Sequence, residues 1–273
     1  KGRVVVVGGG VNGVELAASL AGRFGGAIAV DLVTPGEDIL ESYPKGQRQN
    51  AWNSLSKGKV NVRLGTKVTR VSEDKEGTRG QYRLSTEHVE YGEGAIVADK
   101  ILWTAGQTPV PVPTGEEAEE GSGGGSESGG GGFLARNESG NIVTDSTLRM
   151  VNSSSVFALG DIAVVEGAGG QEMKLGLTAQ VAFQQSDYVA WNVWSAINSQ
   201  PLLPFQYQHL GDMMSLGQNE ATVGLPIGGL NITGLPASLL RKSAYIYRMP
   251  TVEYGARLGL NWASRIIRDQ LRL

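Results

Sequence analysis

The sequence predicts an α/β fold that opens with a parallel sheet and continues into antiparallel strands. The β-branched run Arg3–Val7 is typical of a buried strand, and a glycine turn and a helix-forming stretch from Val14 to Phe24 follow it. A second apolar run, Ala27–Val33, comes within the roughly 30 residues of a βαβ unit. Strand, helix and strand in this order predict parallel pairing.

Later segments predict the remaining elements. The polar-alternating runs 60–64, 67–71 and 81–86 indicate half-exposed antiparallel strands, and 96–103 indicates one further strand. Residues 155–159 predict a short strand, and Thr178 predicts the N-cap of a helix that ends near Ile197. After Pro201 we expect short strands, glycine turns and a C-terminal helix.

Composition excludes several function classes. The chain has no cysteine, so zinc–thiolate sites, cysteine nucleophiles and protein dithiols are excluded, and any redox chemistry must come from a cofactor. Only two histidines are present, His88 and His209, so we expect neither a His-rich metal site nor a Ser-His-Asp triad. The net charge of −3 gives no indication of a nucleic-acid partner.

The glycine turn carries the most specific motif, Gly8-x-Gly10-x-x-Gly13. Gly8 permits a tight turn, Gly10 lets a pyrophosphate approach the backbone, and Gly13 allows close packing of helix on strand. The first N–H groups of the helix would then face the phosphates. In this strand–turn–helix context the motif predicts a Rossmann-like NAD(P)-binding domain, and the alternative is a merely structural turn.

Two further residues are candidates near the nucleotide. Thr34 stands at the end of the second strand, where an acidic residue would favour NAD, so we expect NADPH to be accepted as well as NADH or better. The alternative is that Thr34 only ends the strand and that Glu37 or Asp38 replaces it. Glu15 is expected on the first helical turn, where the helix dipole alone would explain a carboxylate. A role near the nicotinamide is the other reading.

A second group of candidates lies downstream. Gly160-Asp161 follows the predicted short strand and places a carboxylate where it can accept hydrogen bonds from sugar or ribityl hydroxyls. The helix after Thr178 begins Ala179-Gln180-Val181-Ala182-Phe183-Gln184-Gln185, and its N-terminus can stabilise negative charge on a bound ring. Gln180 and Gln184 share one face, either buried with partners or simply exposed.

The stretch from Gly115 to Gly132 is almost only Gly, Ser and Glu, and we expect a disordered surface loop without function. The uncharged stretch from Ala221 to Leu240 is interrupted by glycines and prolines, so we expect no transmembrane helix there. The domain boundaries expected are 1–112 for the nucleotide-binding domain, 113–139 for the insert, 140–200 for the C-terminal part of an FAD-binding domain, and 201–273 for C-terminal strands and an amphipathic helix.

The C-terminus concentrates positive charge. Residues 241–273 hold seven basic and two acidic residues, a balance of 7 − 2 = +5 against −3 for the whole chain. At about 100° per residue, arginines from Arg257 to Arg272 gather on one face, opposite a broad apolar face that includes Trp262 and Ile266. This pattern predicts a helix at a membrane surface, with a docking helix that exposes its arginines as the alternative.

These motifs in this order resemble the flavoprotein reductases with two dinucleotide-binding domains, and most of all the type II NAD(P)H:quinone oxidoreductases of plants, algae and cyanobacteria. The residues that support the resemblance are Val6–Ala17, Leu102–Pro109, Val156–Asp161 and Ala179–Gln185. The last of these, of the form AQxAxQQ, is the most discriminating, because the other three occur across the superfamily.

The resemblance implies cofactors and roles. Gly8, Gly10, Gly13 and Gly106 would border NAD(P)H, and Glu15 would lie near its nicotinamide. Asp161, after Gly160, would bind the ribityl chain of FAD, Ala179 and Gln180 would approach the flavin ring, and Gln180 and Gln184 would line the pocket of a membrane prenylquinone. Hydride would pass from nucleotide to flavin, and electrons and protons to the quinone.

The resemblance also implies a peripheral membrane protein of the chloroplast or mitochondrion that is anchored by its C-terminal helix, with a homodimer as a further expectation. The family has an N-terminal FAD-binding element with its own glycine motif, which this sequence lacks before Lys1, so we expect a fragment of a longer enzyme. Two alternatives stay open. One is a catalytically incomplete NAD(P)-binding module, and the other is a soluble FAD-dependent reductase of a non-quinone acceptor.

Overall fold

The computed structural model describes residues 2–74, 80–107, 134–167, 170–217, 219–226 and 229–271. The chain divides into two compact units, one formed by Lys1–Ala105 with Gly211–Leu273 and the other by Gly106–Leu210. The C-terminal segment therefore belongs to the same unit as the N-terminal strands. The Gly/Ser/Glu-rich stretch from 115 to 132 lies outside the described residues.

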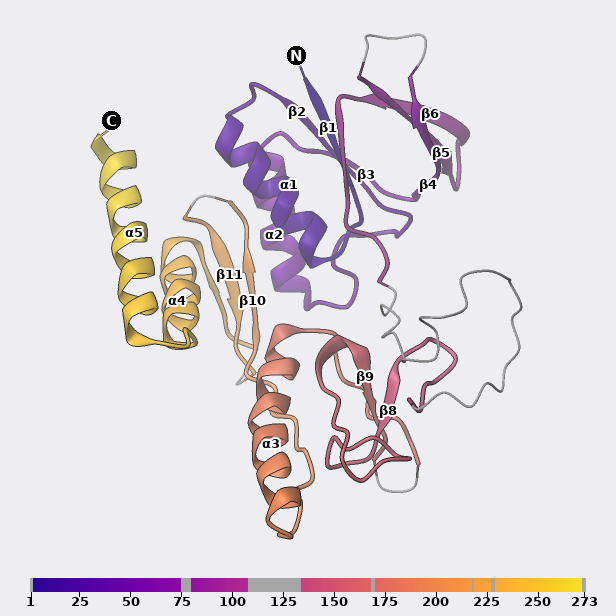
Figure 1. Cartoon of the computed structure of the whole chain (residues 1–273). Helices are drawn as coiled ribbons and strands as arrows, with labels where there is room; N and C mark the ends of the chain where they lie inside the picture. Colours follow the sequence, from indigo (N-terminus) through magenta and orange to yellow (C-terminus); the bar gives the residue numbers. More distant parts are fainter. Residues whose placement is uncertain are drawn as a thin grey trace. The chain divides into compact units, whose positions relative to one another are not determined.

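A four-stranded parallel sheet forms the centre of the first unit, in the order β3-β2-β1-β7. Its strands are β1 (Arg3–Val7), β2 (Ala29–Val33), β3 (Asn61–Arg63) and β7 (Lys100–Trp103). The helices α1 (Val11–Phe24) and α2 (Lys45–Lys57) lie side by side next to this sheet (Figure 1). The predicted βαβ unit is confirmed, whereas α2 was not predicted.

Successive side chains of β1 point to opposite faces of the sheet. Val6 packs against the helices with Val14 and Leu32, while Val5 and Val7 pack against the second sheet with Leu84. The strand is buried on both faces, which is why its sequence is an unbroken run of valines.

The second sheet of this unit is antiparallel and consists of β4 (Thr66–Glu73), β5 (Tyr82–His88) and β6 (Gly92–Ala98). The single strand expected at 96–103 is wrong, because the chain changes sheet at Asp99. The Asp99 carboxylate accepts hydrogen bonds from the Arg3 N–H at 2.6 Å and from the Gln81 amide at 2.9 Å. These bonds hold a turn between β6 and β7.

The C-terminal segment adds a third sheet, β10 (Asp212–Ser215), β11 (Ala221–Gly224) and β12 (Asn231–Thr233), followed by α4 (Gly234–Tyr247) and α5 (Val252–Leu271). Met214 and Leu216 join the core around α1. The expected C-terminal amphipathic helix is confirmed as α5. The helix α4 before it was not predicted, and Pro250, which cannot continue a helix, lies between the two.

The two C-terminal helices run side by side in Figure 1 and meet at small residues. Gly255 and Gly259 of α5 face Ile246 of α4 closely enough that an added Cβ would touch it. Among the described residues, no helix combines the length and the hydropathy that a bilayer crossing requires.

The second unit is built from the parallel pair β8 (Ile142–Thr144) and β9 (Ala163–Val165), the short 3-10 helix η1 (Gly160–Ile162) and α3 (Ala179–Ile197). The helix predicted from Thr178 is confirmed, with the Thr178 hydroxyl accepting from the Val181 N–H at 3.4 Å. The strand expected at 155–159 is wrong, since only a single bridge joins Phe157 to Arg149.

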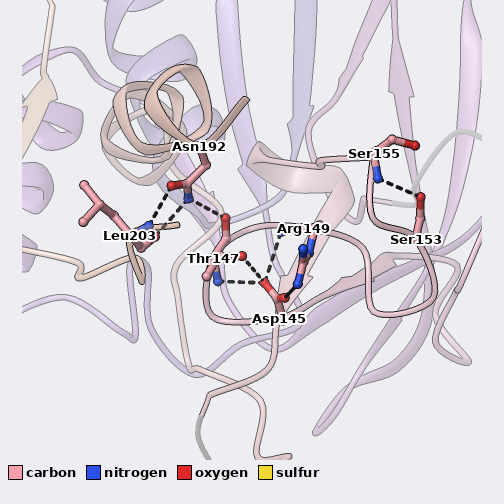
Figure 2. A network of polar contacts seen from close by, with 7 residues as sticks. All are labelled: Asp145, Thr147, Arg149, Ser153, Ser155, Asn192 and Leu203. Carbon is pink, nitrogen blue, oxygen red and sulfur yellow. Dashed lines mark hydrogen bonds and ion pairs between the residues drawn. The ribbon is translucent and has the colours of Figure 1, made fainter. Parts of the chain in front are cut away.

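A network of polar contacts holds α3 in place (Figure 2). The Asn192 amide is fully buried, donates to the carbonyls of Thr147 and Leu203, and accepts from the Leu203 N–H, all within 2.9 Å. The Asp145 carboxylate accepts from the Thr147 N–H at 2.8 Å and the Arg149 N–H at 3.2 Å. One side chain of α3 therefore fixes two loops.

We predict that Asn192→Ala lowers the free energy of unfolding by about 3 kcal/mol, because three backbone groups lose the fully buried amide that pairs with them. Urea unfolding measures this change. Asn198→Ala is the matched control, since Asn198 ends the same helix but is exposed, and we expect a change within about 0.5 kcal/mol. Equal losses in the two variants would contradict the role given to Asn192.

Candidate functional site

The glycine loop between β1 and α1 is shaped by two close approaches. Gly8 has φ of 124°, in the region that favours glycine. A Cβ on Gly13 would collide with the carbonyl oxygen of Gly8, so the first turn of α1 lies directly on the loop. Both positions require glycine for the fold itself.

Gly10 is different, because nothing in the described structure requires it to be glycine. It is the N-cap of α1 with φ of −77°, and a Cβ placed there would meet no atom within 4 Å. The helix has no side-chain cap and no acidic residue in its first turn. The open space at Gly10 therefore lies beside a helix N-terminus that has no side-chain cap. Such a place fits a dinucleotide pyrophosphate, as the motif predicted.

Thr104 completes this loop and was not singled out from the sequence. Its hydroxyl donates to the Val7 carbonyl at 2.8 Å, and its Oγ1 is the nearest side-chain atom to a Cβ on Gly8 or Gly13. Thr104 stands inside the Leu102–Pro109 motif, which was the available signal. Gly106, two residues on, has φ of 77° and opens the second unit.

The structure buries Thr34. The residue is only 6% exposed, and its side chain lies against Gly9. This supports the alternative that Thr34 only ends the strand. Of the two loop acids, Asp38 is bonded to the Trp52 indole at 2.8 Å and to Arg48 at 2.7 Å, while Glu37 is exposed.

The Asp38 carboxyl is held in its charged form. The hydrogen bond from Trp52 is the largest cause that keeps the pKa of Asp38 below its ordinary value, with Arg48 acting in the same direction against desolvation. A carboxylate bonded in this way fastens the loop after β2 onto α2.

Glu15 lies in the second turn of α1, so the expected placement on the first turn is wrong and the helix dipole does not explain it. One carboxylate oxygen accepts from the Ser215 N–H at 2.5 Å and lies 3.7 Å from the Arg241 guanidinium of α4. Burial, and then the charges of Asp212 and Glu15, raise the pKa of Tyr43. Glu15 thus joins α1 to the C-terminal segment.

The second unit holds the remaining candidates. Gly160 has φ of 75°, and its N–H donates to the buried Gln185 side chain at 2.7 Å. Asp161 follows in η1 and is exposed, and Ala179 is exposed at the first position of α3. Because Gln185 ties η1 to α3, the Asp161 carboxylate and the start of α3 are held in one place. An exposed carboxylate in such a place fits a ribityl chain.

Gln180 and Gln184 are half-buried and both have partners. The Gln184 amide exchanges two hydrogen bonds with the backbone of Gln208, at 2.8 and 2.9 Å. The Gln180 Oε1 accepts from the Tyr207 hydroxyl at 2.7 Å and from the Leu210 N–H at 3.0 Å. The two side chains therefore hold the extended segment 207–210 against α3.

Sequence reasoning missed Gln185, Tyr207 and His209 as members of this group. The last residue of the AQxAxQQ motif is Gln185, so a signal for it was present. Tyr207 and His209 carry no motif and lie more than 20 residues after α3 begins. Their place is visible only in the fold.

The fold and the glycine loop define a dinucleotide-binding α/β protein. The chain belongs to the pyridine nucleotide-disulphide oxidoreductase family, whose model matches residues 1–186. Since the chain has no cysteine, it cannot itself perform the disulphide chemistry in the family's name.

Two curated relatives align over 99% of the chain. Alternative NAD(P)H-ubiquinone oxidoreductase C1 of Arabidopsis thaliana is 37% identical, and the match covers 50% of its length. Demethylphylloquinone reductase NdbB of Synechocystis is 36% identical, and the match covers 60%. The chain thus spans about half of the length of these relatives, and the expected resemblance to quinone oxidoreductases is confirmed.

Solved structures share the fold. NDH2 from Plasmodium falciparum, in complex with NADH, has a TM-score of 0.69 at 14% identity, with 96% of this chain and 65% of that chain covered. The flavoprotein disulfide reductase RclA of Escherichia coli has a TM-score of 0.56 at 19% identity, with 82% and 42% covered. The α/β fold of a nucleotide-dependent flavoprotein reductase is confirmed.

We predict that Gly10→Ala leaves the fold intact and lowers the affinity for NADH by at least about tenfold. The added methyl group would occupy the space at Gly10 that a pyrophosphate needs. An alanine N-cap costs only about 1 kcal/mol of stability. Titration calorimetry measures the affinity and thermal unfolding measures the fold.

Gly176→Ala is the matched control, since this glycine has ordinary backbone angles and its Cβ would make ordinary contact with Thr178. It should change neither quantity. Unchanged NADH affinity in Gly10→Ala would contradict the assignment of the loop.

Proposed function

We propose that the chain is the nucleotide-binding and acceptor-side part of a flavin-dependent NAD(P)H:quinone oxidoreductase, with the nucleotide part in 1–112 and the flavin part in 140–200. The observation that carries the proposal is the bond from Gly160 to Gln185, which ties η1, with the exposed Asp161, to α3. A protein that only bound nucleotide would not need this arrangement. The names of the two 36–37% identical relatives support the choice of a quinone as acceptor.

At the nucleotide, the loop Gly8–Gly13 and the first N–H groups of α1 hold the pyrophosphate. Glu15 lies near the nicotinamide in this proposal, held by Ser215 and Arg241. Gly106 borders the same cofactor.

The chain accepts NADPH as well as NADH, in our proposal. Asp38 is already bonded to Arg48 and Trp52, and Thr34 is buried. No acidic side chain therefore stands at the strand end to repel a 2′-phosphate, and the exposed acid Glu37 lies three residues further along the chain.

At the flavin, Asp161 accepts hydrogen bonds from the ribityl hydroxyls. Ala179 and Gln180 lie against the ring, where the N-terminus of α3 favours negative charge. Bound FAD supplies the hydride acceptor that passes two electrons from nucleotide to quinone. Gln180 and Gln184 line the quinone pocket together with the segment 207–210 that they hold.

A second candidate is a nucleotide-binding module without catalysis. The complete glycine loop of the first unit favours it, because that loop needs nothing from the flavin motifs. A third candidate is a flavin reductase that uses an acceptor other than a quinone. The following experiment distinguishes the three candidates.

The test is to incubate the 273-residue chain with FAD, remove free flavin by gel filtration, and add NADH or NADPH and then a soluble quinone. We expect flavin absorbance to stay with the protein, to bleach with either nucleotide and to return with the quinone. Asp161→Ala should lower flavin affinity about tenfold, the value of one lost hydrogen bond to a charged group. Asp187→Ala, an exposed acid on α3, is the control.

A colourless chain that still binds nucleotide would mean either a fragment of the enzyme or the module without catalysis. Flavin that bleaches but does not recover with quinone would favour a different acceptor, and this result would contradict the proposed function.

We also propose that the C-terminal helices bind a membrane surface, as a peripheral protein of an organelle. The described parts of α4 and α5 expose several large apolar side chains, among them Leu239, Tyr247, Val252 and Leu260. Val252 is 92% exposed and Leu260 is 72% exposed. The basic excess of 241–273 suits anionic lipid. A homodimer remains a further proposal, which sedimentation velocity tests.

Flotation with vesicles tests the membrane proposal. We expect the chain to float with anionic vesicles, less with neutral ones, and less at high salt. Leu260→Asp should reduce flotation several-fold. Ile197→Asp is the control, because Ile197 is 77% exposed but lies at the end of α3. Equal flotation of all three proteins would refute the assignment of this surface.

A further inference from the structure

The segment 207–210 brings a histidine and a tyrosine to the start of α3. The Tyr207 hydroxyl lies 2.7 Å from Gln180 Oε1 and 3.3 Å from His209 Nδ1. Tyr207 is half-buried, whereas His209 is exposed. The contacts therefore run from the exposed His209 ring through the Tyr207 hydroxyl to the Gln180 side chain.

The hydrogen bonds fix the direction in which these contacts run. The Leu210 N–H can only donate, so the Gln180 atom that it meets must be the carbonyl oxygen. The Tyr207 hydroxyl meets the same oxygen and must therefore donate to it. A hydroxyl has one hydrogen, so at the other contact Tyr207 accepts and His209 donates from Nδ1.

We propose that His209 and Tyr207 form a proton relay that supplies the quinone bound at Gln180. The inference rests on the proposed function and deepens it, since it assigns the proton path of the acceptor half-reaction. His209 and Tyr207 are positioned as relay residues, and Gln180 orients the Tyr207 hydroxyl.

The proton balance requires such a path. A nicotinamide gives up a hydride, which is two electrons and one proton, whereas a quinone takes up two electrons and two protons to become a quinol. One proton per turnover must therefore come from water. His209 takes it up at Nε2 and passes its Nδ1 proton to the Tyr207 oxygen, while the Tyr207 hydroxyl turns from Gln180 Oε1 to the bound quinone and gives its proton to the quinone oxygen. The O–H bond of Tyr207 breaks and re-forms. His209 ends with its proton on Nε2, and exchange with water returns the proton to Nδ1.

The chemistry of the surroundings suits this role. Histidine is the side chain whose ordinary pKa allows it to exchange protons near neutral pH. On α3 the Tyr207 hydroxyl contacts the uncharged Gln180 amide, and His209 contacts the same hydroxyl. Gln184 binds the backbone of Gln208 and so keeps Tyr207 and His209 in register with Gln180.

The first test needs no cofactor. Nitrogen-15 NMR of the histidine rings shows which nitrogen carries the proton, and the chain has only two histidines, so His88→Asn assigns the signals. We expect neutral His209 to be protonated at Nδ1, and Tyr207→Phe to move that proton to Nε2. A wild-type His209 protonated at Nε2 would overturn the relay.

The second test separates the half-reactions by stopped flow in the FAD-loaded chain. His209→Asn keeps a donor near the Nδ1 position but cannot carry a proton, and Tyr207→Phe removes the hydroxyl. Both should leave bleaching by NADH unchanged and slow the return of flavin absorbance with quinone by at least about tenfold. Added imidazole should restore the rate in His209→Ala. His88→Asn is the control, because His88 only holds the turn at Glu90 and Tyr91.

Failure of the relay and failure of the proposed function give different results. If the wild-type chain reduces quinone and the two variants match its rate, the relay is overturned and the function stands. If the wild-type chain does not reduce quinone at all, the proposed function fails, and the relay fails with it.

Discussion

The first unit depends on the contact between the first turn of α1 and the Gly8 carbonyl. Gly13 has no side chain, so the helix lies directly on the loop. On the other side, the hydroxyl of Thr104, the residue after β7, donates a hydrogen bond to the Val7 carbonyl and holds the loop in place. This contact aims the helix N-terminus at the open space over Gly10. The same constraint brings Glu15 to Ser215 and Arg241, so the nucleotide-binding helix is joined to the C-terminal strands and helices.

In the second unit, amide side chains of α3 have the comparable role. Gln180 and Gln184 bind the segment 207–210, Gln185 binds Gly160, and Asn192 binds two loops. A side-chain amide can donate and accept at once, so it can pair with a backbone segment as a neighbouring strand would. A helix rich in Gln and Asn thereby holds irregular backbone in fixed positions without a continuous sheet.

The elements predicted from sequence were those with a local cause. The valine run of β1, the turn at Gly8–Gly13 and the capped start of α3 all follow from interactions within a few residues of the chain. The errors were non-local. The strand at 96–103 was split because Asp99 binds Arg3 and Gln81. The helix α2 was missed because its few buried residues, such as Ala51 and Leu55, are too sparse to form a periodic signal.

The dinucleotide-binding fold, the need for glycine at positions 8 and 13, and the helix with the AQxAxQQ motif follow from the amino-acid sequence, because each depends on short-range sterics and capping. The burial of Thr34, the contact of Glu15 with Arg241, and the approach of Tyr207 and His209 to Gln180 are seen only in the folded chain. These outcomes depend on which distant segments pack together. Hydrogen-bond partners that lie 27 or 200 residues apart in the chain leave no pattern in a single sequence.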